Sequence, residues 1–190
     1  MSADSRTTQL AKLSRPRLYD ALPRERLFKL LDKSSQHPAV WIAAPPGAGK
    51  TTLVAGWLES RGKSGIWCQV DGGDADPASF FYYLGIAERA RTGRSKKLRP
   101  LSLLTPEHLA DVSGFARRFF RELFGRLGAS AVLVLDNFQE AGGGALHEIV
   151  RIAIENAPAG VSIIIVSRTV PGEDFALPSA SASMAPTRSA

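Results

Sequence analysis

Cysteine is nearly absent from this sequence, with Cys68 alone among 190 residues. An intrachain disulfide and a zinc site built from several cysteines are therefore excluded, because both need a second thiol. The residues around Cys68, among them Ile66 and Val70, are apolar, so we expect a buried thiol rather than a nucleophile. The three histidines are scattered without the spacing of metal ligands, and we assign no site to them.

Long hydrophobic runs are missing as well. The apolar runs, among them residues 39–44 and residues 163–166 with their neighbours, are far shorter than the roughly 20 residues that cross a bilayer. The N-terminal residues 1–9 lack the apolar segment of a secretory signal. We therefore expect a cytoplasmic protein that has no membrane span and begins with a frayed N-terminus.

What is present is the composition of an ordinary globular domain. Hydrophobic residues make up 44% of the chain and charged residues 22%, and the length suits one domain with tails. We expect a lead over residues 1–22, a domain over residues 23–174 and a disordered tail rich in Ser, Ala and Pro over residues 175–190. Basic residues outnumber acidic ones by 24 to 18, a net charge of +6, which suits an anionic partner such as nucleotide or nucleic acid.

Short apolar runs alternate with helical periodicities along the chain. This alternation is typical of a parallel sheet covered by helices. We predict strands over residues 39–44, 65–70, 131–135 and 161–166. We predict helices over residues 24–32, 51–60, 79–90, 107–127 and 145–156. The predicted fold class is α/β, a three-layer P-loop NTPase with a mainly parallel central sheet, and the basic residues 91–100 are expected to form an exposed loop.

One segment, Ala44-Pro45-Pro46-Gly47-Ala48-Gly49-Lys50-Thr51-Thr52, carries the strongest chemical signal. It matches the phosphate-binding loop G-x-x-x-x-G-K-[ST] at every defined position except the first, where Ala44 replaces glycine. The glycines let backbone N–H groups turn around a phosphate, the following helix presents its N-terminus, and Lys50 adds a cation for the β and γ phosphates. A chance Gly-Pro turn is the alternative, and the strand before the loop and the helix after it argue against that. We assign nucleotide binding to Pro46, Gly47, Ala48, Gly49, Lys50, Thr51 and Thr52.

A phosphate loop of this kind calls for an acidic residue at the end of a buried strand to hold Mg²⁺. Asp136 follows the apolar run 131–135 and supplies such a residue. We predict that Asp136 and the Thr51 hydroxyl hold Mg²⁺. Taken alone, an Asp at a strand end is more often a turn former or a helix cap.

The residue that would polarise a water for hydrolysis is less distinct. Asn137 can orient water without accepting its proton, and Glu140 is the nearest carboxylate, with a solvated loop acid as an equal alternative. Arg168 lies where the last strand ends, the edge at which ligands of open parallel sheets bind, so it is a candidate sensor of the γ-phosphate or else a surface arginine. We expect slow hydrolysis or tight nucleotide holding. The predicted catalytic residues are Lys50, Asp136, Arg168 and Glu140.

These motifs resemble the ATPase module of large ATP-binding LuxR-type transcriptional regulators, the maltose-activator-like branch of the STAND class of P-loop NTPases. The similarity extends over about residues 12–174, and six segments carry it: Lys12 to Pro16, Pro23 to Leu27, Ala44 to Leu53, Trp67 to Phe80, Val132 to Phe138 and Val166 to Arg168. The resemblance implies an ATP-driven switch coupled to an inducer and to oligomerisation of a transcription factor. It implies that ATP and Mg²⁺ are held by Gly49, Lys50, Thr51 and Asp136. It also implies that the lead around Arg24 lies near the adenine.

The sequence departs from that family in several features. The usual second Asp after the metal-binding residue is Asn137 here, and no helix-turn-helix segment is present to read DNA, so direct DNA binding is not expected. A homo-oligomer or a regulator partner protein fits the resemblance. We expect four core strands of a fold that usually has five, from a stand-alone or truncated module, with an exposed sheet edge after Arg168.

Two other functions stay open from the residues alone. A small-molecule or nucleotide kinase shares the phosphate loop, and residues 91–99 are the only candidate for its mobile basic lid. A non-catalytic interaction module would use bound nucleotide only for folding. The same basic residues could touch nucleic acid by charge alone, but no aromatic residue interleaves them to stack a base, so a solvated loop is favoured.

Overall fold

The computed structural model describes residues 11–19, 22–92, 98–142, 144–172 and 175. The predicted frayed N-terminus over residues 1–9 lies outside the described residues. So do residues 93–97 of the basic loop and the tail from residue 176 onward. Within the described part, no helix is long and apolar enough to cross a membrane.

Within the described residues, four strands form a single sheet in which every neighbouring pair is parallel. They are β1 (Ala39–Ala43), β2 (Gly65–Gln69), β3 (Val132–Asp136) and β4 (Ser162–Ser167). The strand order is β1-β4-β3-β2. Both faces of the two central strands are buried, which explains why β3 and β4 read as runs of Val, Leu and Ile without alternation. The predicted α/β class with a parallel sheet is confirmed.

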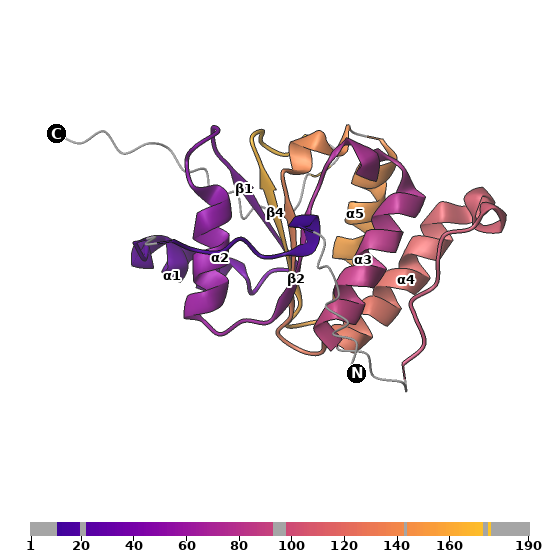
Figure 1. Ribbon diagram of the computed structural model, residues 1–190, viewed down its shortest axis with the longest axis horizontal. Helices are drawn as coiled ribbons and strands as arrows, with labels where there is room; N and C mark the ends of the chain where they lie inside the picture. The colour runs from indigo at the N-terminus through magenta and orange to yellow at the C-terminus, as the bar shows by residue number, and fades with distance from the viewer. Residues whose placement is uncertain (1–10, 20–21, 93–97, 143, 173–174, 176–190) are drawn as a thin grey trace, which may run out of the picture.

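In the part of the chain that the structure describes, five α-helices cover the two faces of the sheet (Figure 1). On one face lie α1 (Glu25–Ser34) and α2 (Lys50–Ser60), and on the other lie α3 (Pro77–Thr92), α4 (Val112–Leu127) and α5 (Ala145–Glu155). Short 3₁₀ segments lie between them: η1 (Ala11–Leu13), η2 (Gly72–Ala75), η3 (Pro106–Asp111) and η4 (Phe138–Ala141). The result is the three-layer arrangement that the sequence pattern predicted.

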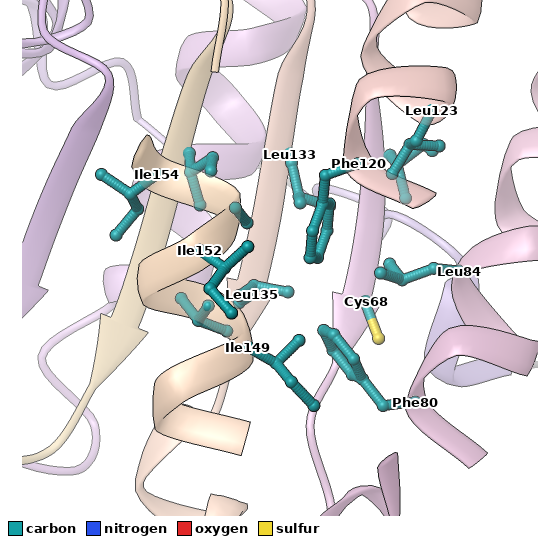
Figure 2. Packing of buried hydrophobic residues seen from close by; sticks show 14 of the residues in the cluster. Cys68, Phe80, Leu84, Phe120, Leu123, Leu133, Leu135, Ile149, Ile152 and Ile154 are labelled. Atoms are coloured by element: carbon teal, nitrogen blue, oxygen red, sulfur yellow. The ribbon is translucent and has the colours of Figure 1, made fainter. Parts of the chain in front are cut away.

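Alternating side chains of the strands divide the apolar interior into two clusters. On β1, Val40 and Ile42 pack with α1 and α2, whereas Trp41 points to the opposite face. The larger cluster, between the sheet and α3 to α5, is rich in phenylalanine. Figure 2 shows Phe80 and Phe120 among its leucine and isoleucine side chains. Cys68 is fully buried there as a free thiol, which confirms the prediction of a buried cysteine, and burial raises its pKa to about 12.

The single helix predicted over residues 107–127 is wrong at its beginning. Residues 106–111 form η3, and α4 starts only at Val112 because the Asp111 carboxylate accepts a hydrogen bond from the Gly114 N–H at 2.8 Å and caps the helix. Leu109, expected on the apolar face, is 61% exposed. The helical spacing of apolar residues continues from η3 into α4, although Asp111 separates the two elements by capping α4.

The expected basic loop over residues 91–100 also begins too early. Helix α3 continues to Thr92, and Arg91 is not a freely solvated side chain. Its guanidinium donates to the Ser64 hydroxyl and, at 3.1 Å, to the Leu127 carbonyl at the end of α4. Arg91 therefore ties α3 to the ends of two other elements.

The position of the open sheet edge differs from the expectation. The strand that ends before Arg168 is β4, and β4 lies between β1 and β3. The edge strands of the sheet are β1 and β2 instead. Strand order is not encoded in strand sequence, so the last strand in the chain was a poor guide to the edge of the sheet.

Segments outside the predicted domain boundaries pack against the sheet. The Lys12 ammonium donates to Asp71 at 2.9 Å and to the fully buried Asp74 at 2.9 Å, and Leu13 is buried in the larger cluster. At the other end, Phe175 is buried against Trp41 with ring centroids 5.2 Å apart. Both ends of the described chain are therefore held by tertiary contacts.

Candidate functional site

The loop between β1 and α2 has the backbone that a phosphate-binding loop requires. Gly47 and Gly49 adopt φ values of 77° and 76°, in the left-handed region that glycine occupies without strain. Ala44, which replaces the first glycine of the motif, is not among the positive-φ residues. An alanine is therefore compatible with the entrance of this loop.

Helix α2 begins at Lys50 directly after the loop. Its N-cap is Gly49, and no side chain accepts a hydrogen bond from its first N–H groups. These donors, together with the positive end of the helix dipole, suit an anion. The Lys50 ammonium donates to the carbonyls of Ala44 at 2.6 Å and Pro45 at 2.9 Å, which holds the cation at the mouth of the loop.

Thr51 and Asp136 lie in contact at the carboxyl-terminal end of the parallel strands. The Thr51 hydroxyl donates to the Asp136 carboxylate, with oxygen–oxygen distances of 3.2 and 3.0 Å. Asp136 is the last residue of β3, and the N–H of Asn137 also donates to it at 2.9 Å. The fold thus brings together the two oxygen-bearing side chains that the sequence assigned to Mg²⁺. One carboxylate with one hydroxyl fits Mg²⁺, which usually combines a few protein oxygens with phosphates and waters.

Burial sets the charge state of Asp136, which is only 4% exposed. Burial raises the pKa of this carboxyl above its ordinary value, while the hydrogen bonds from Thr51 and Asn137 and the charge of Lys50 act in the opposite direction. A cation beside this buried carboxylate would stabilise its ionised form.

Arg24 reaches the loop from the start of α1. Its guanidinium donates to the Ala48 carbonyl at 3.2 Å, and a Cβ at Gly49 would come within 3.1 Å of its Nη2. The nucleotide-binding assignment of Arg24 therefore has a geometric counterpart, namely contact with the phosphate loop itself.

An apolar pocket of about 230 Å³ lies beside the loop, between the lead, α1 and α2. Arg24 and Thr52 line it, together with Leu18 and Phe28. Gly56 belongs to the same wall, where a Cβ would lie 3.3 Å from the Phe28 ring. A pocket of this size, below the roughly 300 Å³ of a typical small-molecule site, suits one ring system rather than a whole nucleotide. Sequence reasoning missed these apolar residues, although Leu18 and Phe28 flank the motif-bearing lead.

Arg168 comes directly after β4, at the same end of the sheet as the loop. Its side chain is exposed, and its backbone N–H donates to the Gln139 side chain at 3.0 Å. Gln139 was not predicted as a site residue. It links the turn after Asp136 to the turn after β4.

Glu140 lies in η4, four residues after Asp136, and is exposed. Its carboxylate accepts a hydrogen bond from Gln139 at 3.2 Å. Among the described residues, Glu140 makes no hydrogen bond or ion pair with the loop, Thr51 or Asp136. Of the predicted catalytic residues, Lys50 and Asp136 lie at the loop and its metal-binding pair, whereas the side chains of Glu140 and Arg168 are exposed.

The amino-acid sequence of the chain is similar to that of a known class of transcriptional regulator. The HTH-type transcriptional regulator MalT of Yersinia pestis is 33% identical over 163 residues, which is 85% of this chain and 18% of that protein. Over this segment the chain is homologous to MalT. The MalT of Yersinia enterocolitica is 32% identical over the same coverage. The chain thus spans about a fifth of the length of the MalT proteins that it matches. The resemblance to maltose-activator-like regulators, drawn from the motifs, is confirmed.

Other comparisons add little to the homology with MalT. No family profile matches the sequence. Among solved structures, the ORC1 protein of Aeropyrum pernix, in complex with DNA, aligns with 20% identity over 78% of this chain and 40% of that chain, at a TM-score of 0.45. A likeness at that score carries no argument. The loop geometry and the homology to MalT together support a nucleotide-binding P-loop module.

Proposed function

We propose that this chain binds ATP with Mg²⁺ and serves as a nucleotide-dependent switch module of the STAND class that hydrolyses ATP slowly or not at all. The observation that carries the proposal is the meeting of Thr51 and Asp136 at 3.0 Å, directly behind the glycine loop and Lys50. A turn that formed by chance would not bring a metal-binding pair, a mobile cation and an uncapped helix N-terminus to one end of a sheet.

Each residue has a separate task in the proposed complex. The backbone N–H groups from Gly47 to Thr51 bind the phosphates, and Lys50 moves from the loop carbonyls to the β and γ phosphate oxygens. Thr51 and Asp136 hold Mg²⁺, which neutralises charge on the phosphates when it is bound. Arg168 lies at the same carboxyl-terminal end of the strands, where a planar guanidinium can contact the γ-phosphate.

The apolar pocket next to Arg24 is the proposed site of the base. It opens beside the phosphate loop and is lined mainly by carbon atoms of Leu18, Phe28 and Leu53. An aromatic wall suits a purine ring. The choice of adenine rests on the resemblance to ATP-binding regulators.

Slow hydrolysis is proposed because neither of the two residues considered for activating water, Glu140 and Asn137, is suited to act as a general base. Glu140 is exposed and engaged with Gln139, and Asn137 offers an amide that cannot accept a proton. A module that holds ATP without rapid turnover can report nucleotide state to a partner protein or to another copy of itself. Because MalT is a transcriptional regulator, we propose that the reported state controls transcription through such a partner.

Thermal unfolding with and without ligand tests this function. At ATP concentrations of about 100 times Kd, binding adds roughly 2.7 kcal/mol of stability, or a rise in Tm of about 5 to 10 °C for a chain of this size. ATP with Mg²⁺ should give that rise, ATP with EDTA a smaller one and GTP the smallest. Phosphate release measured in the same samples should be far slower than the 1 to 10³ s⁻¹ that is typical of enzymes. Equal, negligible shifts with all three ligands would refute nucleotide binding.

A further inference from the structure

A second cavity, of about 360 Å³, lies at the opposite end of the sheet from the phosphate loop. It is formed at the start of β2, because Gly65 and Trp67 line it, whereas the phosphate loop follows the end of the parallel strand β1. Its walls come from the lead, through Leu13 and Arg15, and from the last turns of α2 and α3. Nothing in the proposed nucleotide site uses it.

The charge of this cavity is one-sided, since its lining includes three basic side chains and no carboxylate. Two of the three are Lys63 and Arg91. The Lys63 ammonium lies 5.1 Å from the centre of the Trp57 ring and also interacts electrostatically with the Asp32 carboxylate, which does not line the cavity. Arg91 donates to two neutral oxygens, those of Ser64 and Leu127, so its charge is not neutralised by these contacts.

The third cation, Arg15, has a carboxylate only at a distance. Its guanidinium lies 3.9 Å from Glu59, and the two side chains are 42% and 61% exposed. A pair this long and this exposed contributes little. The cavity therefore presents net positive charge that an acidic ligand would complement.

The floor of the cavity is the outer edge of β2. The Ser64 carbonyl accepts from the Val132 N–H at 3.1 Å, and the Val70 N–H donates to the Asp136 carbonyl at 2.7 Å. Even-numbered residues of this strand therefore direct their backbone groups to β3. Since backbone direction alternates along a strand, the odd-numbered ones face outward.

Gly65 and Trp67 are the outward-facing residues that line the cavity. Within the described residues, β2 is an edge strand and no backbone bond to Gly65 or Trp67 is made from outside the sheet. Such an edge is a template for a further strand. Here the template lies between basic side chains.

We propose that this cavity is a docking site for an extended, acidic peptide segment of a partner protein. The segment adds as a strand along the outer edge of β2, with its backbone hydrogen-bonded to Gly65 and Trp67. Its acidic side chains meet Arg15, Lys63 and Arg91. A small anion would satisfy the charges but leave the strand edge unused, so a peptide accounts for both observations.

A titration of the full chain with labelled peptides tests the proposal by fluorescence anisotropy. The probe is a capped five-residue peptide of alternating Glu and Val. Two companions separate the two contributions: one with Gln in place of Glu, and one with the same charge but with N-methylated backbone amides. At low salt the Glu peptide should bind about tenfold more tightly than either companion. Added salt should reduce its preference over the Gln peptide, because only those two differ in charge.

Variants of the chain test the location. Arg15→Gln combined with Lys63→Gln should weaken the Glu peptide about tenfold. Arg117→Gln combined with Arg118→Gln removes the same charge from exposed positions of α4 and should change little. Arg91 is left intact because it holds α3 to the end of α4.

The outcomes are distinct. Slower amide hydrogen exchange at Gly65 and Trp67 on adding the Glu peptide, with no effect of the α4 variant, supports strand addition. Equal binding of the Glu and N-methylated peptides would mean that charge alone drives binding, and would overturn the proposal. An equal loss of peptide affinity in both double variants, or no binding of the Glu peptide, would also overturn it. ATP is absent from these samples, so failure here leaves the nucleotide site untouched.

Discussion

Asp136 is a buried acidic residue that we also assign to Mg²⁺ binding. Its carboxyl is raised in pKa by burial, so in the native state the ionised form is disfavoured relative to the unfolded chain. The stability that this group contributes is present below its unfolded pKa and is lost as pH rises through its folded pKa. At neutral pH the ionised Asp136 therefore reduces the stability of the ligand-free protein.

Asp136→Asn should consequently raise the Tm of the ligand-free protein at pH 7, because the amide keeps the hydrogen-bond acceptor for Thr51 without the buried charge. The gain should shrink as the pH falls, since native Asp136 then becomes neutral. The same variant should lose the extra stabilisation that Mg²⁺ adds to ATP. Thermal unfolding across pH 4 to 8 measures the first effect and a Mg²⁺ titration the second. A lower Tm at pH 7 would contradict the argument.

Arg24 gives a second prediction for a single side chain. Arg24→Ala removes the guanidinium from the Ala48 carbonyl and a cation from beside the loop, so ATP affinity should fall about fivefold. Arg26→Ala, on the exposed side of the same helix, is the matched control and should bind ATP as the native chain does. Calorimetric titration of both variants decides, and similar losses in the two would show that the effect is one of overall charge.

Some residues of the site could be read from the sequence and others could not. Lys50, Thr51 and Asp136 follow from a motif whose spacing reflects the physics of phosphate and Mg²⁺ binding. The contact of Arg24 with the loop, and the bridge from Gln139 to the backbone of Arg168, depend on how distant segments pack. Short-range patterns do not contain that information.

Among the elements, β2 is the one whose sequence is most tightly constrained by its neighbour. A Cβ added at Gly65 would lie 2.2 Å from the Val132 carbonyl oxygen, which is fixed backbone of β3. Gly65→Ala should therefore destabilise the protein by roughly 2 to 4 kcal/mol.

Gly125 in α4 is the matched control for that substitution. A Cβ there meets nothing within 4 Å, so Gly125→Ala should stabilise the protein by roughly 0.5 to 1 kcal/mol. Urea unfolding of both variants measures the two changes. Destabilisation by Gly125→Ala, or tolerance of Gly65→Ala, would be inconsistent with the packing described for β2 and α4.

Element boundaries were harder to predict than element types. All four strands were found near their predicted positions because their apolar runs are short and rich in branched residues. The error at Leu109 arose because apolar periodicity ignores capping, and Asp111 sets the true start of α4. The last turn of α3 was missed because Arg91 and Thr92 carry no apolar signal.

For the whole molecule, the strand order is the feature that sequence could not supply. The order β1-β4-β3-β2 makes β1 and β2 the edges and brings the ends of β1, β3 and β4 together, where Lys50, Asp136 and Arg168 lie. The order depends on how the crossover helices pack over the sheet, which no single segment records. The same arrangement separates the nucleotide site from the basic cavity at the start of β2.

The most direct test of the whole account is an ATP titration, in the presence of Mg²⁺, of the native chain and of Lys50→Ala. The native chain should bind ATP saturably. Lys50→Ala should bind at least about tenfold more weakly, because it loses a charge-assisted contact to the phosphates, while its far-UV circular dichroism stays unchanged. Equal affinity of the two proteins for ATP would contradict the assignment of this loop as a nucleotide site.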